Sequence, residues 1–125
     1  MRLEHAEKFH EVAELVAHES ETIPASASVS ASLAILAGIA AADAACCTAL
    51  GRRSRSQDHK HAVDLLRQVV PGGPGTAASL DRLLDLKDAA QYGVINVSGQ
   101  NLRAALRQAT IVVEFAKDVL RRSPG

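Results

Sequence analysis

The segment 52–61 contains the densest group of residues that could carry chemistry, because it brings together Arg53, Arg55, His59 and His61. A guanidinium can bind a phosphate through two hydrogen bonds, and a histidine can move a proton near neutral pH. Cleavage of RNA through its 2′-hydroxyl needs both, a base for that hydroxyl and a cation beside the phosphorane. The alternative interpretation is a solvated, basic turn at the entrance of a helix.

Three polar residues occupy positions where the helical pattern favours apolar side chains. Asp43 shares a line with Leu36 and Cys47, His59 heads the apolar face of its helix, and Lys87 continues a leucine-rich face. A buried charge must be paired or it shifts its pKa and becomes neutral. We therefore expect Asp43 to be largely buried and partnered, by Lys87 first and by His59 second. These residues could form one site between helices, or a structural ion pair with a lysine that reaches water.

Neither a metal site nor a reactive thiol is expected. Asp58, His59 and His61 lack the i, i+4 spacing that puts ligands on one helical face. The adjacent Cys46 and Cys47 point about 100° apart on a helix, so they do not form a disulfide framework. An apolar helix also raises a thiol pKa and lowers its reactivity. We expect no cofactor and a reduced, cytoplasmic setting.

Composition narrows the range of functions. The 125 residues fit one domain, 1–125. The chain has 14 basic and 14 acidic residues, so it lacks the basic excess of a general nucleic-acid binder. Aromatic residues make up only 2%, which leaves few platforms for stacking bases. A net charge of zero also weakens self-repulsion and permits oligomers.

Helical periodicity predicts an all-α fold, an up-and-down bundle of about five helices of which four form the core. No period-two strand pattern occurs, and short connections between long helices imply antiparallel neighbours. The predicted helices cover 3–20, 28–50, 56–70, 77–92 and 98–122.

Local signals predict where these helices begin and end. Pro24 disfavours helix at the residue before it and ends the first helix, and Gly51 is a natural stop for the second. Ser56 and Ser98 are good N-caps for the third and fifth helices. The run 71–75, with two prolines and three glycines, predicts a loop.

The stretch 30–50 is almost wholly apolar, and a membrane span is one interpretation. It consists mostly of alanine and serine, and Asp43 in its middle would cost about 2.5–3.5 kcal/mol at a bilayer centre. We therefore predict a central helix covered on most sides, and no membrane partner.

The order of these features has a parallel in a known family. An alanine-rich helix ends at Gly51, and basic residues and the run 58–66 follow. A leucine-rich helix closes with 86–93, and Ser98 opens a final amphipathic helix. Over about 28–120 this order resembles the HEPN superfamily, named for higher eukaryotes and prokaryotes nucleotide-binding, and in particular its small stand-alone bacterial members.

The resemblance implies a bundle that dimerises and has a link to RNA, nucleotides, toxin–antitoxin pairs or phage defence. Active ribonucleases of the superfamily carry an arginine, usually followed by a polar residue, and a histidine after four to six intervening residues. Arg53 with His59, and Arg55 with His61, both match this spacing.

Four further residues are candidate positions for binding: Asp43, Asp58, Lys87 and Tyr92. Lys87 stands where many relatives have an arginine before the tyrosine, which weakens bidentate phosphate binding at that point.

Two functions of different classes follow. The first is a non-catalytic, homodimeric helical domain that binds a cognate partner protein, a nucleotide or RNA. The second is a metal-independent ribonuclease of the toxin or phage-defence type, whose arginine and histidine form a composite site across the dimer.

Overall fold

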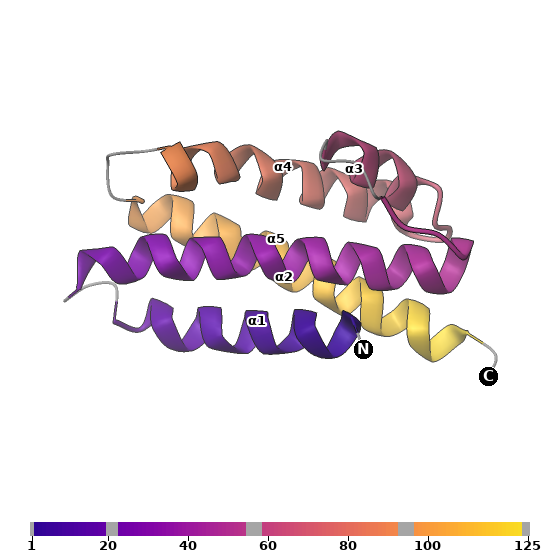
Figure 1. The fold of residues 1–125 in the computed structure, drawn as a ribbon, viewed down its shortest axis with the longest axis horizontal. Helices are drawn as coiled ribbons and strands as arrows, with labels where there is room; N and C mark the ends of the chain where they lie inside the picture. Colours follow the sequence, from indigo (N-terminus) through magenta and orange to yellow (C-terminus); the bar gives the residue numbers. More distant parts are fainter. Residues whose placement is uncertain (1, 20–22, 55–58, 93–96, 124–125) are drawn as a thin grey trace.

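The computed structural model describes residues 2–19, 23–54, 59–92 and 97–123, apart from the side chains of Pro24, His59 and 87–92. Within these ranges the chain forms helices and no strand, which confirms the predicted all-α class. Figure 1 shows that α1, α2, α4 and α5 lie alongside one another in alternating directions, with the short α3 beside α4. The helices are α1 (Arg2–Ala17), α2 (Pro24–Leu50), α3 (His59–Arg67), α4 (Gly73–Tyr92) and α5 (Gly99–Arg122).

The central helix is α2, which contacts each of the other four helices. Its inward side chains are almost all small, and the buried set includes Ala31, Ala34, Ala37, Ala41 and Ala45. An added Cβ at Gly38 would collide with the side chain of Leu83 on α4. Small side chains therefore let α2 approach its neighbours closely.

The residues Ala25–Leu50 are long and apolar enough for a membrane span by length and composition. In the bundle, half of the most apolar 18-residue window of that stretch is buried against protein. One stripe of α2 stays open to solvent, where Val29 is 50% and Leu36 is 45% exposed. The helix is thus covered on most of its circumference, as predicted.

Helix boundaries differ from the predicted ones in the first half of the chain. The first helix ends at Ala17 instead of residue 20, and α2 begins at Pro24 instead of residue 28. Proline suits the first position of a helix because its missing N–H would have no partner there. Pro24 therefore starts a helix, although the sequence suggested only that it ends one.

The predicted loop 71–75 is also corrected, because Gly73, Pro74 and Gly75 form the first turn of α4. Thr76 secures this turn, since its backbone N–H and its hydroxyl both donate to the carbonyl of Gly72 at 3.2 and 3.0 Å. The third helix is shorter than predicted, because α3 ends at Arg67 instead of residue 70.

Two predicted helix ends are confirmed. Gly51 has φ +70° and donates its N–H to the Cys47 carbonyl at 3.0 Å, so it ends α2 in the left-handed conformation that glycine favours. The hydroxyl of Ser98 accepts the N–H of Asn101 at 3.0 Å and caps α5. The third expected cap, Ser56, lies outside the described residues.

Candidate functional site

The predicted arginine–histidine pairs are described only in part. Arg53 is half-buried after the end of α2, and His61 is exposed in the first turn of α3. The imidazole Nδ1 of His61 lies 3.2 Å from the hydroxyl oxygen of Ser54. Arg55 and the side chain of His59 lie outside the described residues. The structure therefore does not test either pair, and both remain predictions.

The basic residues beside these pairs hold the segment onto neighbouring helices. Arg52 donates to Oε1 of Gln68 at 3.0 Å. Lys60 forms an ion pair with Asp81 of α4 and lies 3.7 Å from Asp85. The pKa of Lys60 is raised above its ordinary value, mainly by its hydrogen bond to Asp81. Arg52 is thus joined to the residue after α3, and Lys60 joins α3 to α4.

Asp43 is largely buried and partnered, as predicted. Its side chain is 14% exposed, and its Oδ2 lies 3.2 Å from Nη1 of Arg2 at the start of α1. The side chains of both predicted partners, Lys87 and His59, lie outside the described ones.

The predicted helical face around Asp43 needs a correction, because Leu36 and Cys47 on the same stripe are exposed. The stripe faces outward beside α1, and the Arg2 guanidinium covers the carboxylate there. Asp58 and Tyr92, the other candidate binding residues, also fall outside the described side chains.

The two cysteines differ in their surroundings. Burial raises the pKa of the Cys46 thiol from 9.0 to about 11, and the negative charge of Asp43 adds to that rise. Cys47, the next residue, is exposed. The expected low reactivity is thus supported at Cys46, whereas the thiol of Cys47 is accessible to solvent. No group of three or more His, Cys, Asp or Glu in the described part of the chain could hold a metal ion.

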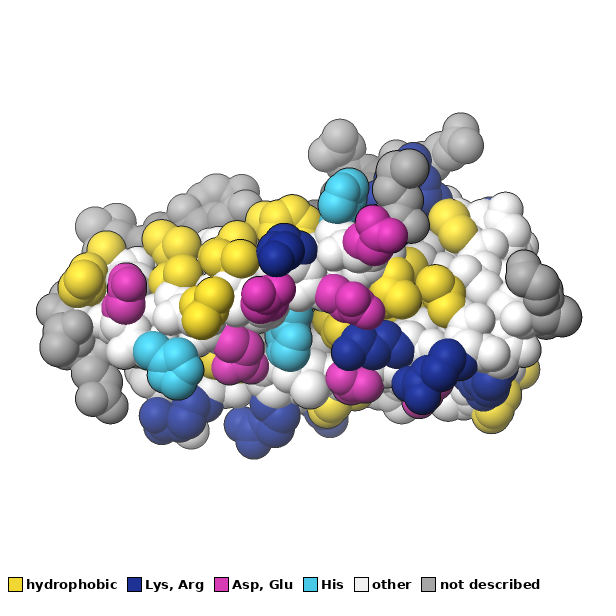
Figure 2. Space-filling view, turned by 90° about the horizontal axis from the view of Figure 1, so that it is seen from below, with side chains coloured by type: hydrophobic (Ala, Val, Ile, Leu, Met, Phe, Trp, Pro, Cys, Tyr) yellow, Lys and Arg dark blue, Asp and Glu magenta, His cyan; other side chains and the backbone are white. Residues whose placement is uncertain are grey.

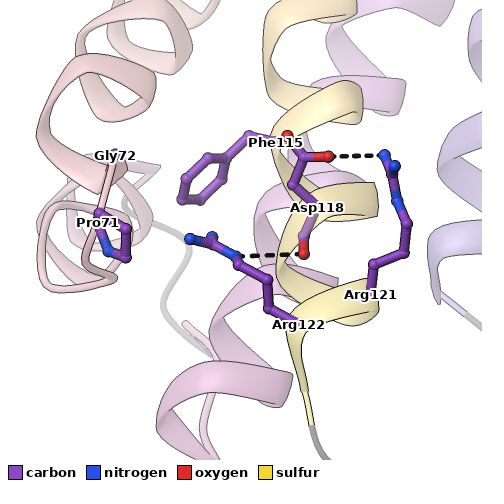
Figure 3. A pocket seen from close by; sticks show the side chains of 6 residues that line it. All are labelled: Pro71, Gly72, Phe115, Asp118, Arg121 and Arg122. Carbon is purple, nitrogen blue, oxygen red and sulfur yellow. Dashed lines mark hydrogen bonds and ion pairs between the residues drawn. The ribbon is translucent and has the colours of Figure 1, made fainter.

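A pocket that the sequence did not suggest lies where the turn before α4 meets the last turns of α5. It has a volume of about 440 Å³ and is lined by Pro71, Gly72, Phe115, Asp118, Arg121 and Arg122. In Figure 3 the Phe115 ring and the Arg122 guanidinium both point from α5 toward the Pro71–Gly72 turn.

The turn and the ring depend on each other. Gly72 has φ +97°, and a Cβ there would lie 2.9 Å from Cε1 of Phe115. A glycine is therefore needed both for the backbone conformation and for the approach of the ring. This contact fixes one face of the pocket.

Asp118 arranges the two arginines differently. Its carboxylate accepts a hydrogen bond from Nη2 of Arg121 at 2.6 Å, and its backbone carbonyl accepts one from Nε of Arg122 at 3.3 Å. Figure 3 shows Arg121 directed away from the phenyl ring and Arg122 directed toward it. Among the described residues, the two terminal nitrogens of Arg122 have no hydrogen-bond partner, so their donors are open to an anion.

A second pocket, of about 340 Å³, shares Pro71 and Arg122 with the first and reaches Thr48 and Ala49 at the end of α2. Arg122 therefore lines both pockets. Both lie at the end of the bundle where α2 gives way to the predicted basic segment (Figure 1).

Comparisons with known proteins add no identification. No family model matches the chain, and searches of the curated proteins and of the solved structures found no match. In the residues that it describes, the structure defines a bundle of five helices without strands, with a pocket at one end that Arg121 and Arg122 line. The HEPN resemblance stays a prediction.

Proposed function

We propose that this protein is a non-catalytic binding domain, and that the pocket between Phe115 and Arg122 takes a phosphate-bearing ligand of nucleotide size. The observation that carries the proposal is the pairing of an aromatic ring and an open guanidinium on one pocket. A ring offers a face to a nucleobase, and a guanidinium offers paired donors to a phosphate.

Size and preorganisation support the same ligand class. A volume of about 440 Å³ lies within the usual range of small-molecule sites, roughly 300–1,000 Å³. A long, 3.3 Å bond from Nε of the exposed Arg122 to the Asp118 carbonyl favours the orientation of the guanidinium toward the pocket. A group already held in its binding orientation loses less entropy when it binds.

Charge favours a short ligand over a long nucleic acid. The chain is neutral overall, and Asp118 offsets Arg121 inside the pocket. One open arginine suits one phosphate group or a small cluster of phosphates, whereas a polymer would need a basic track.

The test is a titration of the protein with AMP, ATP and inorganic phosphate. Binding is measured by isothermal titration calorimetry and by changes in backbone amide chemical shifts. We expect nucleotide binding, with shifts centred on 71–72 and 115–122. Arg122→Gln should weaken binding roughly 10- to 100-fold, because a hydrogen bond to a charged group is lost. Phe115→Leu should weaken the binding of nucleotides more than the binding of inorganic phosphate.

Arg67→Gln is the matched control, because Arg67 is an exposed arginine whose partner, Asp64, lies on its own helix. It should leave the affinity unchanged. Absence of binding at millimolar nucleotide, or equal losses in Arg122→Gln and Arg67→Gln, would refute the proposal.

The competing proposal is the metal-independent ribonuclease predicted from the sequence. It is tested by incubating the purified protein with total RNA in EDTA, beside Arg55→Ala and His59→Ala. Arg55→Ala disables one predicted pair and His59→Ala the other, so cleavage that either substitution abolishes would assign an enzyme, and the pocket would then be an accessory site. Cleavage that survives both would point to a contaminating nuclease.

A further inference from the structure

The second pocket, at the end of α2, differs in chemistry from the first one. We call the first the Phe115 pocket and the second the Val70 pocket. Most side chains of the Val70 pocket are aliphatic, and its described lining is Thr48, Ala49, Val69, Val70, Pro71, Val119, Arg122 and Ser123. Among these residues Arg122 alone is charged and none has an aromatic ring. The Val70 pocket therefore suits an aliphatic group better than a nucleobase.

The walls of the Val70 pocket leave apolar surface in contact with water. Val69 and Val119 are buried and form its inner side. Val70 is 74% exposed, more than any other large hydrophobic side chain among the described residues. Apolar surface of this kind gains free energy when a ligand removes it from water. An aliphatic group in the pocket would cover the side chain of Val70.

Two residues, Pro71 and Arg122, line both pockets. On α5, Arg122 follows Asp118 of the Phe115 pocket by four positions and Val119 of the Val70 pocket by three. Residues at these spacings are neighbours on the surface of a helix. The terminal nitrogens of Arg122 have no hydrogen-bond partner among the described residues. A phosphate bound to them would therefore have room for one substituent in each pocket.

The charges of the two pockets favour a phosphate with two ester groups. Arg121 and Asp118 form an ion pair and offset each other, so Arg122 carries the one remaining charge of the described lining residues. A phosphate monoester carries nearly two negative charges at neutral pH, because its second pKa is about 6. A phosphodiester carries a single negative charge. One open guanidinium matches the charge of the diester.

A nucleic acid strand also contains phosphodiesters, but it fits the two pockets less well. A second nucleoside would need a ring on which to stack, and the described lining of the Val70 pocket has none. Figure 2 shows acidic side chains across the middle of the face seen from below, so a strand that continued over this face would meet like charges. A short conjugate that ends in an aliphatic group avoids both costs.

We propose that the two pockets together bind a nucleotide conjugate, a phosphodiester with a nucleoside in the Phe115 pocket and a small aliphatic group in the Val70 pocket. This inference rests on the proposed function, since it keeps the nucleotide beside Phe115 and the phosphate at Arg122. It adds the second substituent and the single charge. Each methylene that enters the Val70 pocket should raise the affinity about two- to fourfold.

A series of AMP esters tests the proposal by isothermal titration calorimetry. The ligands are AMP, its methyl, butyl and 2-methoxyethyl phosphate esters, and the dinucleotide ApA. The methyl ester should bind at least as tightly as AMP, because it carries the single charge. The butyl ester should bind about 8- to 60-fold more tightly than the methyl ester, for three added methylenes. The 2-methoxyethyl ester is as long as the butyl ester but more polar, so its gain should be smaller.

Two variants test whether the gain arises in the Val70 pocket. Val70→Ser makes the exposed side of the pocket polar, and Ala49→Phe fills the pocket from the end of α2. Each should lower the ratio of the butyl-ester affinity to the methyl-ester affinity at least about threefold. The matched control is Val29→Ser, at an exposed valine roughly 30 Å along α2 from Thr48, and it should leave the ratio unchanged. Far-UV circular dichroism shows whether each variant is folded.

The outcomes separate this proposal from the proposed function. A gain from butyl that both pocket variants reduce and Val29→Ser preserves would establish the conjugate site. If AMP binds but the butyl ester binds no more tightly than the methyl ester, this proposal fails and the proposed function stands. If neither AMP nor any ester binds, both fail. Tighter binding of ApA than of the butyl ester would overturn the aliphatic group, and a gain that survives in both pocket variants would overturn its place.

Discussion

Replacing Gly72 with alanine should destabilise the protein through two separate costs. The residue has φ +97°, and an L-residue in the left-handed region costs roughly 1–2 kcal/mol. The new methyl would lie 2.9 Å from Cε1 of Phe115, and overpacking of this kind costs about 1–3 kcal/mol. Alanine also lowers the conformational entropy of the unfolded chain, which offsets about 0.4–1 kcal/mol of this destabilisation. We therefore expect the free energy of unfolding to fall by about 1–5 kcal/mol.

Two other glycines separate these costs. Gly51 also has positive φ, at +70°, but no atom lies within 4 Å of its added Cβ, so Gly51→Ala carries only the backbone cost. We expect it to lose about 1 kcal/mol. Gly75 lies in the first turn of α4 without positive φ and without near neighbours. Gly75→Ala should stabilise the protein by about 0.5–1 kcal/mol.

The assay is urea unfolding followed by far-UV circular dichroism, with the three variants and Gly72→Ala/Phe115→Leu measured together. In the double variant the smaller leucine should restore part of the free energy of unfolding that Gly72→Ala removes, because the phenyl ring that the new methyl group would contact is absent. If Gly72→Ala costs no more than Gly51→Ala, the phenyl ring does not press on the turn. The account of how the pocket wall is fixed would then be wrong.

Four further measurements test the fold. Ser30→Ala removes a buried donor that lies 2.6 Å from the Ala13 carbonyl, so it should lower the free energy of unfolding by about 1–3 kcal/mol; an unchanged urea midpoint would contradict this. Leu80→Ala empties a fully buried position between α4 and its neighbours and should cost about 2–5 kcal/mol in the same assay. At pH 8 a thiol reagent should modify Cys47 quickly and Cys46 slowly, as mass spectrometry of the peptide would show. Burial raises the pKa of Cys46 in the folded protein to about 11, so the contribution of its protonated thiol to the free energy of unfolding is complete below pH 9 and should be lost as the pH rises toward 11. A free energy of unfolding that rises over this range would contradict the assigned burial.

The helices could be predicted because their signals are local. Gly51 and Ser98 end or begin a helix through bonds to residues three or four positions away, and such bonds depend on the neighbouring sequence alone. The run 71–75 was predicted as a loop because proline and glycine favour loops, although proline is also favoured in the first turn of a helix. The bonds from Thr76 to Gly72 decide between the two, and composition does not reveal them.

The pocket could not be predicted because its wall comes from two segments far apart in the chain. Gly72 and Phe115 meet only after α4 and α5 pack side by side. The adjacent Arg121 and Arg122 looked alike in the sequence, and only Asp118 distinguishes them, by holding one with its carboxylate and the other with its carbonyl. Arg2 was not foreseen as a partner of Asp43 for the same reason, since it belongs to another helix, and the predicted partners lie outside the described side chains.

The alanine-lined interior of α2 narrows the range of substitutions that the chain tolerates. Removing the methyl group of Ala34 or Ala41 leaves glycine, which costs about 0.5–1 kcal/mol in a helix interior, and a larger side chain at either fully buried position would overpack the contact with the neighbouring helices. Substitution is therefore disfavoured in both directions at such sites, whereas a leucine-rich core accepts exchanges of similar volume. A chain built in this way has few voids left to fill, so thermostable variants should come from helix ends and surface charges and not from a better-filled interior.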